Sequence, residues 1–147
     1  MKKIIIGSDH AAFSMKEFVK GLLSSKGFDV IDVGTHSEDR CDYPDYASAL
    51  SKEVIAQKCL GVLLCGSGIG VSIVANRYRG IRAALCRSPY DAEMSKKHND
   101  ANVLCLGARV NSEHEIKEIL DMWLASSFEN GRHADRIKLF SEIGEKV

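Results

Sequence analysis

The chain has 147 residues, of which 45% are hydrophobic and 27% are charged, so residues 1–147 suit a single domain with an ordinary core. Its 20 basic and 20 acidic residues cancel, and a net charge of zero argues against broad binding to nucleic acid or to a membrane surface. The apolar runs are all shorter than the roughly 20 residues that cross a bilayer, so we predict no membrane partner.

The N-terminal segment and the cysteines indicate where the protein works. The apolar run from Ile4 to Ile6 stops before the polar segment Ser8-Asp9-His10, so it does not fit a signal peptide. The five cysteines are odd in number and include no Cys-x-x-Cys pair, which favours a reduced, cytoplasmic protein. Histidines and cysteines show no metal-ligand spacing, so we expect no metal.

Apolar runs alternate with helical patterns along the chain. In chain order we predict a strand at residues 3–7, a helix at 12–26, a strand at 28–33, a loop at 34–43, a helix at 44–58, a strand at 60–65, a helix at 69–78, a strand at 81–86, a helix at 89–97, a strand at 102–106, and helices at 112–127 and 132–145. Continuous apolar strands in such an alternation indicate a parallel sheet covered on both faces, and hence a three-layer α/β domain with a C-terminal helical extension.

Unusual residues follow the first, third and fifth predicted strands. The first strand ends in Gly7-Ser8-Asp9-His10, the third in Cys65-Gly66-Ser67-Gly68-Ile69-Gly70, and the fifth in Gly107-Ala108-Arg109. Because α/β folds bind ligands beyond the carboxyl ends of their parallel strands, we expect the chemistry to collect at this edge of the sheet.

The segment from Cys65 to Gly70 is the most informative of these. Glycines at alternate positions let backbone N–H groups approach a ligand closely, and the unpaired N–H groups of the following helix point back to the same place. Such a loop can hold a phosphate or a developing oxyanion, although a tight turn without a ligand would look the same. The spacing does not match a dinucleotide-binding motif, and the lysine of a P-loop is missing, so a nucleotide site is disfavoured.

Cys65 is a candidate base. A thiol near a helix N-terminus has a stabilised thiolate, and its pKa can fall from about 8.5 towards neutrality, which suits a base at pH 7. A nucleophilic role would add a neighbouring histidine as proton acceptor, which the sequence alone does not place. The alternative is a buried structural cysteine.

Polar groups elsewhere have both functional and structural interpretations. Asp9 and His10 follow the first strand and could contact a ligand, or Asp9 could simply cap the next helix. His98-Asn99-Asp100 could act on a ligand or end a helix after two lysines that complement its dipole. Arg132 and Arg136 are four residues apart on one helix face, where they could clamp a phosphate or form a solvated pair. His36 and His114 have no context that suggests a role.

Taken together, these residues resemble the ribose-5-phosphate isomerase B family, which includes the galactose-6-phosphate isomerase subunits. The matching stretches occur in order along nearly the whole chain: Gly7-Ser8-Asp9-His10-Ala11, Asp42-Tyr43-Pro44, Cys65-Gly66-Ser67-Gly68-Ile69-Gly70, Asn76-Arg77, Gly80-Ile81-Arg82-Ala83, His98-Asn99-Asp100-Ala101-Asn102-Val103-Leu104, Gly107-Ala108-Arg109 and Gly131-Arg132-His133. No single stretch is decisive, but the ordered set is highly specific.

The resemblance implies a five-stranded Rossmann-like domain, acting as a dimer or a dimer of dimers, that interconverts ribose 5-phosphate and ribulose 5-phosphate without a cofactor. It implies Cys65 as the base, because Val71 stands where another branch of the family has a glutamate, and His98 with Asp9 as the ring-opening group. The substrate contacts that it implies are the anion loop Gly66, Ser67, Gly68, Ile69 and Gly70, phosphate contacts at His10, Arg109, Arg132 and Arg136, and sugar contacts at Tyr43, Ser67 and Asn99.

The positions of Cys65 and His98 predict a shared active site. Cys65 follows the third strand, whereas His98 precedes the fifth, so in a parallel sheet they fall near opposite edges. We therefore expect His98, and with it Arg132 and Arg136, to reach the site from a partner subunit. Two other functions remain open: a six-carbon (galactose or allose) 6-phosphate isomerase, and a non-catalytic sugar-phosphate or nucleotide sensor.

Overall fold

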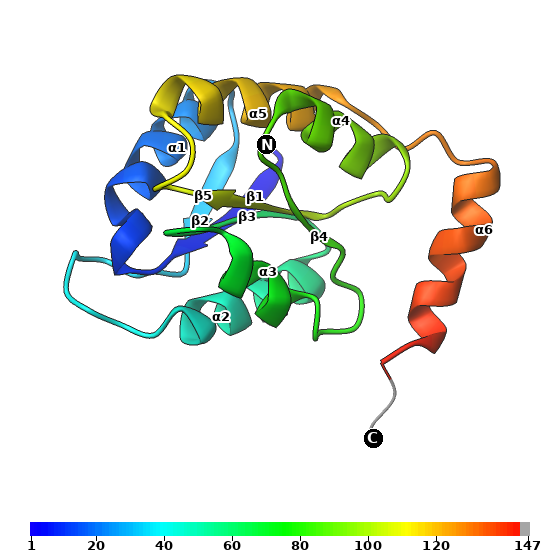
Figure 1. Cartoon of the computed structure of the whole chain (residues 1–147), viewed down its shortest axis with the longest axis horizontal. Helices are drawn as coiled ribbons and strands as arrows, with labels where there is room; N and C mark the ends of the chain where they lie inside the picture. Colours follow the sequence, from blue (N-terminus) through cyan, green and yellow to red (C-terminus); the bar gives the residue numbers. More distant parts are fainter. Residues whose placement is uncertain (145–147) are drawn as a thin grey trace.

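The computed structural model describes residues 1–144, and within them a five-stranded parallel sheet has the order β2-β1-β3-β5-β4 (Figure 1). The strands are β1 (Lys3–Ser8), β2 (Asp29–Asp32), β3 (Leu60–Cys65), β4 (Ala83–Leu85) and β5 (Val103–Gly107). The helices are α1 (Phe13–Ser25), α2 (Tyr43–Gln57), α3 (Ile69–Ala75), α4 (Pro89–Lys97), α5 (Glu113–Ala125) and α6 (Arg132–Lys138), with 3-10 turns η1 (His10–Ala12) and η2 (Leu139–Glu142).

The sheet is covered on both faces, as predicted. Alternate residues of each central strand enter opposite hydrophobic clusters, so that Ile4 and Ile6 of β1 pack with α1, α4 and α5, while Ile5 packs with α2 and α3. Figure 1 shows these two helical layers above and below the strands. The predicted three-layer, Rossmann-like α/β fold is confirmed, and no helix among residues 1–144 is both long and apolar enough to cross a membrane.

Several predicted boundaries were wrong by a few residues. The helix predicted at 69–78 ends at Ala75, because the side-chain amide of Asn76 pairs with both the N–H and the carbonyl of Ala83 at 2.8 and 2.9 Å. Ala83 is the first residue of β4, which covers only 83–85 of the predicted 81–86. The last predicted helix, 132–145, is α6 followed by the turn η2, and its final residue lies outside the described residues.

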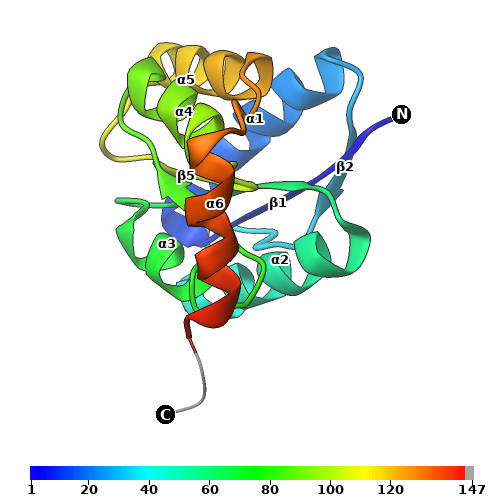
Figure 2. The same cartoon turned by 90° about the vertical axis from the view of Figure 1, so that its right-hand side faces the viewer.

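The C-terminal extension stands away from the three layers. None of the residues of α6 is buried, and Leu139 and Phe140 of η2 are exposed. Figures 1 and 2 show α6 beyond the β4 side of the sheet, running from the level of α4 and α5 towards that of α3.

A buried ion pair joins α1 to the end of β2. Lys16 is fully buried, and its ammonium donates to both carboxylate oxygens of Asp32, at 2.7 and 2.8 Å, and to the carbonyl of Thr35. Lys20 donates to the same carboxylate at 2.8 Å. Burial raises the pKa of Asp32, but hydrogen bonds from the two lysines and from the amide of Gly34 outweigh burial and hold this pKa below its ordinary value.

Replacing Asp32 by Asn keeps the shape of the side chain but leaves the buried Lys16 ammonium without its counter-charge. We expect Asp32→Asn to lower the free energy of unfolding at pH 7 by about 3–5 kcal/mol, measured by urea denaturation. Asp29→Asn is the control, since Asp29 is exposed on the same strand and its replacement should change the free energy by less than about 0.5 kcal/mol.

The pH dependence checks the sign of this interaction. Because the pKa of Asp32 is lowered by folding, its charge contributes stability that is fully present above its unfolded pKa of about 3.9 and is lost as pH falls through the folded pKa. The stability difference between wild type and Asp32→Asn should therefore be constant near neutral pH and shrink in acid. Equal unfolding curves for the two proteins at pH 7 would contradict the assignment.

Candidate functional site

The carboxyl ends of β1, β3 and β5 meet at the centre of the sheet. Ser8 pairs with Leu64 between β1 and β3, and Cys65 pairs with Gly107 between β3 and β5. An open pocket of about 610 Å³ lies at this edge. Its lining residues are Asp9, His10, Ala11, Tyr43, Cys65, Gly66, Ser67, Ile69, Gly70, Ile73, Arg109 and Val110.

Cys65 is buried but reaches this pocket. Its side chain is 5% exposed, and its Sγ accepts a hydrogen bond of 3.1 Å from the backbone N–H of Gly68. The sulfur is therefore held at the start of the glycine loop, at the edge of the pocket. Cys86 and Cys105 lie in the core clusters, as Cys65 does, but they do not line the pocket. Burial raises the pKa of Cys86 to about 11 and also raises that of Cys105. Both core thiols are therefore protonated at neutral pH.

The glycine loop is more compact than its sequence indicates. Gly68 has a φ of 78°, and a Cβ there would lie 2.9 Å from the backbone of Leu106, so only glycine fits both the conformation and the space. The amide of Ile69 donates to Ser67 Oγ at 3.2 Å. The N–H groups of Gly68 and Ile69 already donate hydrogen bonds within the loop. Only the other backbone amides of the loop can therefore donate to a ligand.

Tyr43 and Arg109 each lie against a different glycine of the loop. A Cβ on Gly70 would lie 2.6 Å from Cζ of Tyr43, and one on Gly66 would lie 3.2 Å from Nη1 of Arg109. Both side chains therefore lie directly over a glycine of the loop. This places an aromatic hydroxyl and a guanidinium beside the Cys65 pocket.

Asp9 and His10 form the wall contributed by β1. Asp9 Oδ1 accepts a hydrogen bond of 3.2 Å from the amide of Ala12, so the capping role considered from the sequence is present. Asp9 also lines the pocket and is 7% exposed. The amide of Cys41 donates to His10 Nδ1 at 3.2 Å, which leaves Nε2 of a neutral His10 as the protonated nitrogen.

The remaining predicted residues do not line this pocket. His98 follows α4 at the amino end of β5, and about 13 Å of strand separates that end from the level of Cys65. Asn99 lines a different cavity, and Arg132 and Arg136 are exposed on α6. Gly68 is the one residue of the loop from Gly66 to Gly70 that does not line the pocket, and it is buried.

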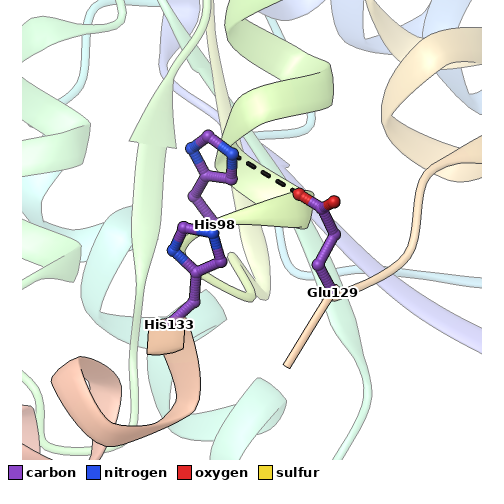
Figure 3. A group of neighbouring side chains, drawn as sticks. All are labelled: His98, Glu129 and His133. Atoms are coloured by element: carbon purple, nitrogen blue, oxygen red, sulfur yellow. Dashed lines mark ion pairs between the residues drawn. The ribbon is translucent and has the colours of Figure 1, made fainter. Parts of the chain in front are cut away.

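His98 lies in a second polar cluster that sequence patterns did not indicate (Figure 3). Its Nε2 lies 3.4 Å from Oε1 of Glu129, and its ring stacks on that of His133 with centroids 4.3 Å apart and planes 15° apart. Burial and then the charges of His98 and the α6 arginines lower the pKa of His133 below its ordinary value. Glu129 was not predicted, and His133 was noted only as part of the stretch Gly131-Arg132-His133, because both residues reach His98 only through the path of the chain after α5.

Comparisons with known proteins show the family of the chain. The family model described as Ribose/Galactose Isomerase matches residues 4–140. The chain belongs to this family. It is 44% identical to ribose-5-phosphate isomerase B of Escherichia coli (strain K12), over 99% of each chain.

Solved structures of this family share the fold of the chain. A ribose 5-phosphate isomerase from Thermotoga maritima superposes with a TM-score of 0.94 at 48% identity, over 97% of this chain and 99% of that one. Ribose-5-phosphate isomerase B from Mycoplasma genitalium, solved with bound ribulose-5-phosphate, gives a TM-score of 0.93 at 36% identity, over 99% and 97%. The resemblance inferred from the ordered motifs is thereby confirmed.

The conformation of Gly68 predicts that this position is intolerant of a side chain. We expect Gly68→Ala to lower the free energy of unfolding by about 1–3 kcal/mol, because alanine is strained at positive φ and its Cβ meets backbone. Gly21→Ala is the matched control: Gly21 lies within α1 with nothing near its Cβ position, so alanine should stabilise the protein by roughly 0.5–1 kcal/mol. Urea denaturation measures both, and a Gly68→Ala protein as stable as wild type would refute the constraint.

Proposed function

We propose that the protein interconverts ribose 5-phosphate and ribulose 5-phosphate, with Cys65 as the base. The observation that carries this proposal is the sulfur of Cys65 beside a glycine loop, at a pocket walled by His10, Tyr43 and Arg109. Membership of the Ribose/Galactose Isomerase family supports it, as does the relative solved with ribulose-5-phosphate.

The reaction moves one proton between neighbouring carbons. In the open-chain aldose, the Cys65 thiolate takes the proton from C2, and the electrons of that C–H bond form the C1–C2 double bond while negative charge develops on the C1 oxygen. The thiol then returns the proton to C1, and the proton of the C2 hydroxyl is transferred to the C1 oxygen, which leaves a ketone at C2. Substrate and product have the same overall oxidation state, so the reaction needs no redox cofactor.

The pocket walls suit the developing charge and the phosphate. Free amides of the loop from Gly66 to Gly70 can stabilise the enediolate oxygen, a contribution typically worth about 2.7–4 kcal/mol for each donor. His10 Nε2 and the Arg109 guanidinium can donate to the phosphate, and Tyr43 and Ser67 to the sugar hydroxyls. In this arrangement Asp9 assists ring opening from the β1 wall.

The remaining groups come from a second subunit in this proposal. His98 opens the sugar ring, and Asn99, Arg132 and Arg136 complete the contacts to sugar and phosphate. The separation of His98 from Cys65 along β5 and the exposed position of α6 support a homodimer, or a dimer of dimers, with shared sites. A cytoplasmic location is supported by the five cysteines, which all lie in the described residues and are free thiols.

Replacing Cys65 by Ala tests the base. We expect Cys65→Ala to lower kcat by about 10²- to 10⁴-fold while calorimetry shows ribose 5-phosphate binding within a few-fold of wild type. Cys59→Ala is the control, since Cys59 lies outside the pocket and burial raises its pKa. Full turnover in Cys65→Ala would sink the assignment and favour another base; no isomerase activity in wild type, with ligand binding retained, would favour a sensor.

Mixed oligomers test the shared site. Cys65→Ala and His98→Asn proteins should each be inactive, but when they are unfolded together and refolded, mixed dimers contain one intact composite site. Random pairing then predicts recovery of about a quarter of wild-type activity. If both groups act within one protomer, every site in the mixture stays damaged and no activity returns.

A direct assay tests whether the preferred substrate is a five-carbon or a six-carbon sugar phosphate. The same wild-type preparation should isomerise ribose 5-phosphate with a higher kcat/KM than galactose 6-phosphate or allose 6-phosphate, without added metal or cofactor. A preference for a six-carbon phosphate would keep the mechanism and change the substrate.

A further inference from the structure

Three metal-binding side chains converge beside the C-terminal end of α4. His98 directly follows α4, Glu129 lies in the connection between α5 and α6, and His133 lies in α6. One donor atom of each lies within 4.8 Å of the other two (Figure 3). The backbone holds this arrangement, because the amide of His98 donates to the carbonyl of Met94 at 2.9 Å and that of Glu129 to the carbonyl of Lys97 at 3.0 Å.

We propose that His98, Glu129 and His133 form a binding site for a divalent transition-metal ion, represented by Zn²⁺. Two imidazoles and one carboxylate are a common ligand set for zinc, with a further position open to water. Zinc holds such ligands at about 2.0–2.2 Å, so the three donor atoms must approach one another, and the stacked His133 ring must turn. The side chains have room for this, since His98 is 40% exposed and Glu129 is 52% exposed.

The charges around the cluster select the kind of ion. Arg132 and Arg136 lie on the same helix as His133 and repel cations, whereas Glu129 provides a compensating charge. Mg²⁺ and Ca²⁺ bind mainly through charge and oxygen ligands, and the cluster offers only one carboxylate beside two arginines, so we expect these ions to bind weakly. An ion that bonds strongly to neutral imidazole nitrogen is favoured, which points to Zn²⁺, Co²⁺ or Ni²⁺.

Metal binding would oppose the isomerase reaction, an effect that rests on the proposed function. A metal ion coordinated by His98 occupies the nitrogen that the ring-opening step needs. The ion would therefore be an inhibitor rather than a cofactor, and its removal by a chelator would restore turnover.

The binding test uses untagged, full-length protein stripped of metal with EDTA. In competition with a chromogenic chelator, wild type should bind about one equivalent of Zn²⁺ per chain and show no response to Mg²⁺. Glu129→Gln and His133→Asn should each weaken zinc binding by at least about tenfold. His114→Asn is the matched control, because His114 also lies beside a carboxylate, 3.0 Å from Glu118, but is 79% exposed and outside the cluster.

Cobalt spectra separate this cluster from the thiols. Cys41 Sγ lies 3.8 Å from His10 Nδ1, so a thiol and imidazole pair near the pocket is the competing site. Co²⁺ bound by His98, Glu129 and His133 should give weak visible bands without the intense thiolate-to-cobalt absorption. Thiolate absorption, or zinc affinity unchanged in both Glu129→Gln and His133→Asn, overturns the proposal.

An activity measurement separates failure of this inference from failure of the proposed function. Zn²⁺ should inhibit wild-type isomerase reversibly, and Glu129→Gln should need at least about tenfold more Zn²⁺ for the same fractional inhibition. Zinc binding with no isomerase activity in metal-free protein would refute the proposed function alone. Active isomerase that binds no zinc would refute this inference alone.

Discussion

The loop from Gly66 to Gly70 lies directly against the end of β5, and the geometry of the pocket depends on this contact. Backbone amides that follow β5 donate hydrogen bonds of 2.9 Å to the carbonyls of Cys65 and Gly66. A Cβ on Gly107 would lie 2.6 Å from the carbonyl oxygen of Ser67, so the two segments approach this closely only through glycine. The contact turns the chain at the end of β3 and leaves the sulfur of Cys65 at the pocket.

The layers of the fold could be predicted because burial on both faces imposes a pattern on the strands. Ile4, Ile5 and Ile6 are apolar in succession since they enter two different clusters, and this differs from the alternation of a half-exposed strand. The residues at which helices and strands end depend on individual side-chain contacts, and the apolar periodicity of the sequence does not predict these contacts. Asn76 is an example: its side chain pairs with the backbone of Ala83, and this pairing accounts for the end of α3 at Ala75. Ala83 is also the first residue of the short strand β4.

Pocket residues were predictable to the extent that they follow strands. Asp9 and Arg109 come just after β1 and β5, Cys65 is the last residue of β3, and the parallel arrangement of these strands brings all three residues to one edge. The cluster of His98 and His133 had no such signal, because its members come from a helix end and from the extension after α5. His98 and His133 come together only because of the conformation of the connection between α5 and α6, and the apolar periodicity of the sequence does not predict that conformation.

The position of His98 gives it two competing chemical capacities. A proton carrier must present a nitrogen lone pair to solvent or substrate, and at a helix end beside Glu129 the imidazole is accessible and oriented. The same accessibility and the same carboxylate are what a metal ion requires, and the stacked His133 adds a further donor. Burial of His98 would suppress the proposed metal binding, but it would also prevent the imidazole from acting as the proposed proton carrier. The proposed acid/base role and the proposed metal site therefore depend on the same exposed junction between α4 and the C-terminal extension.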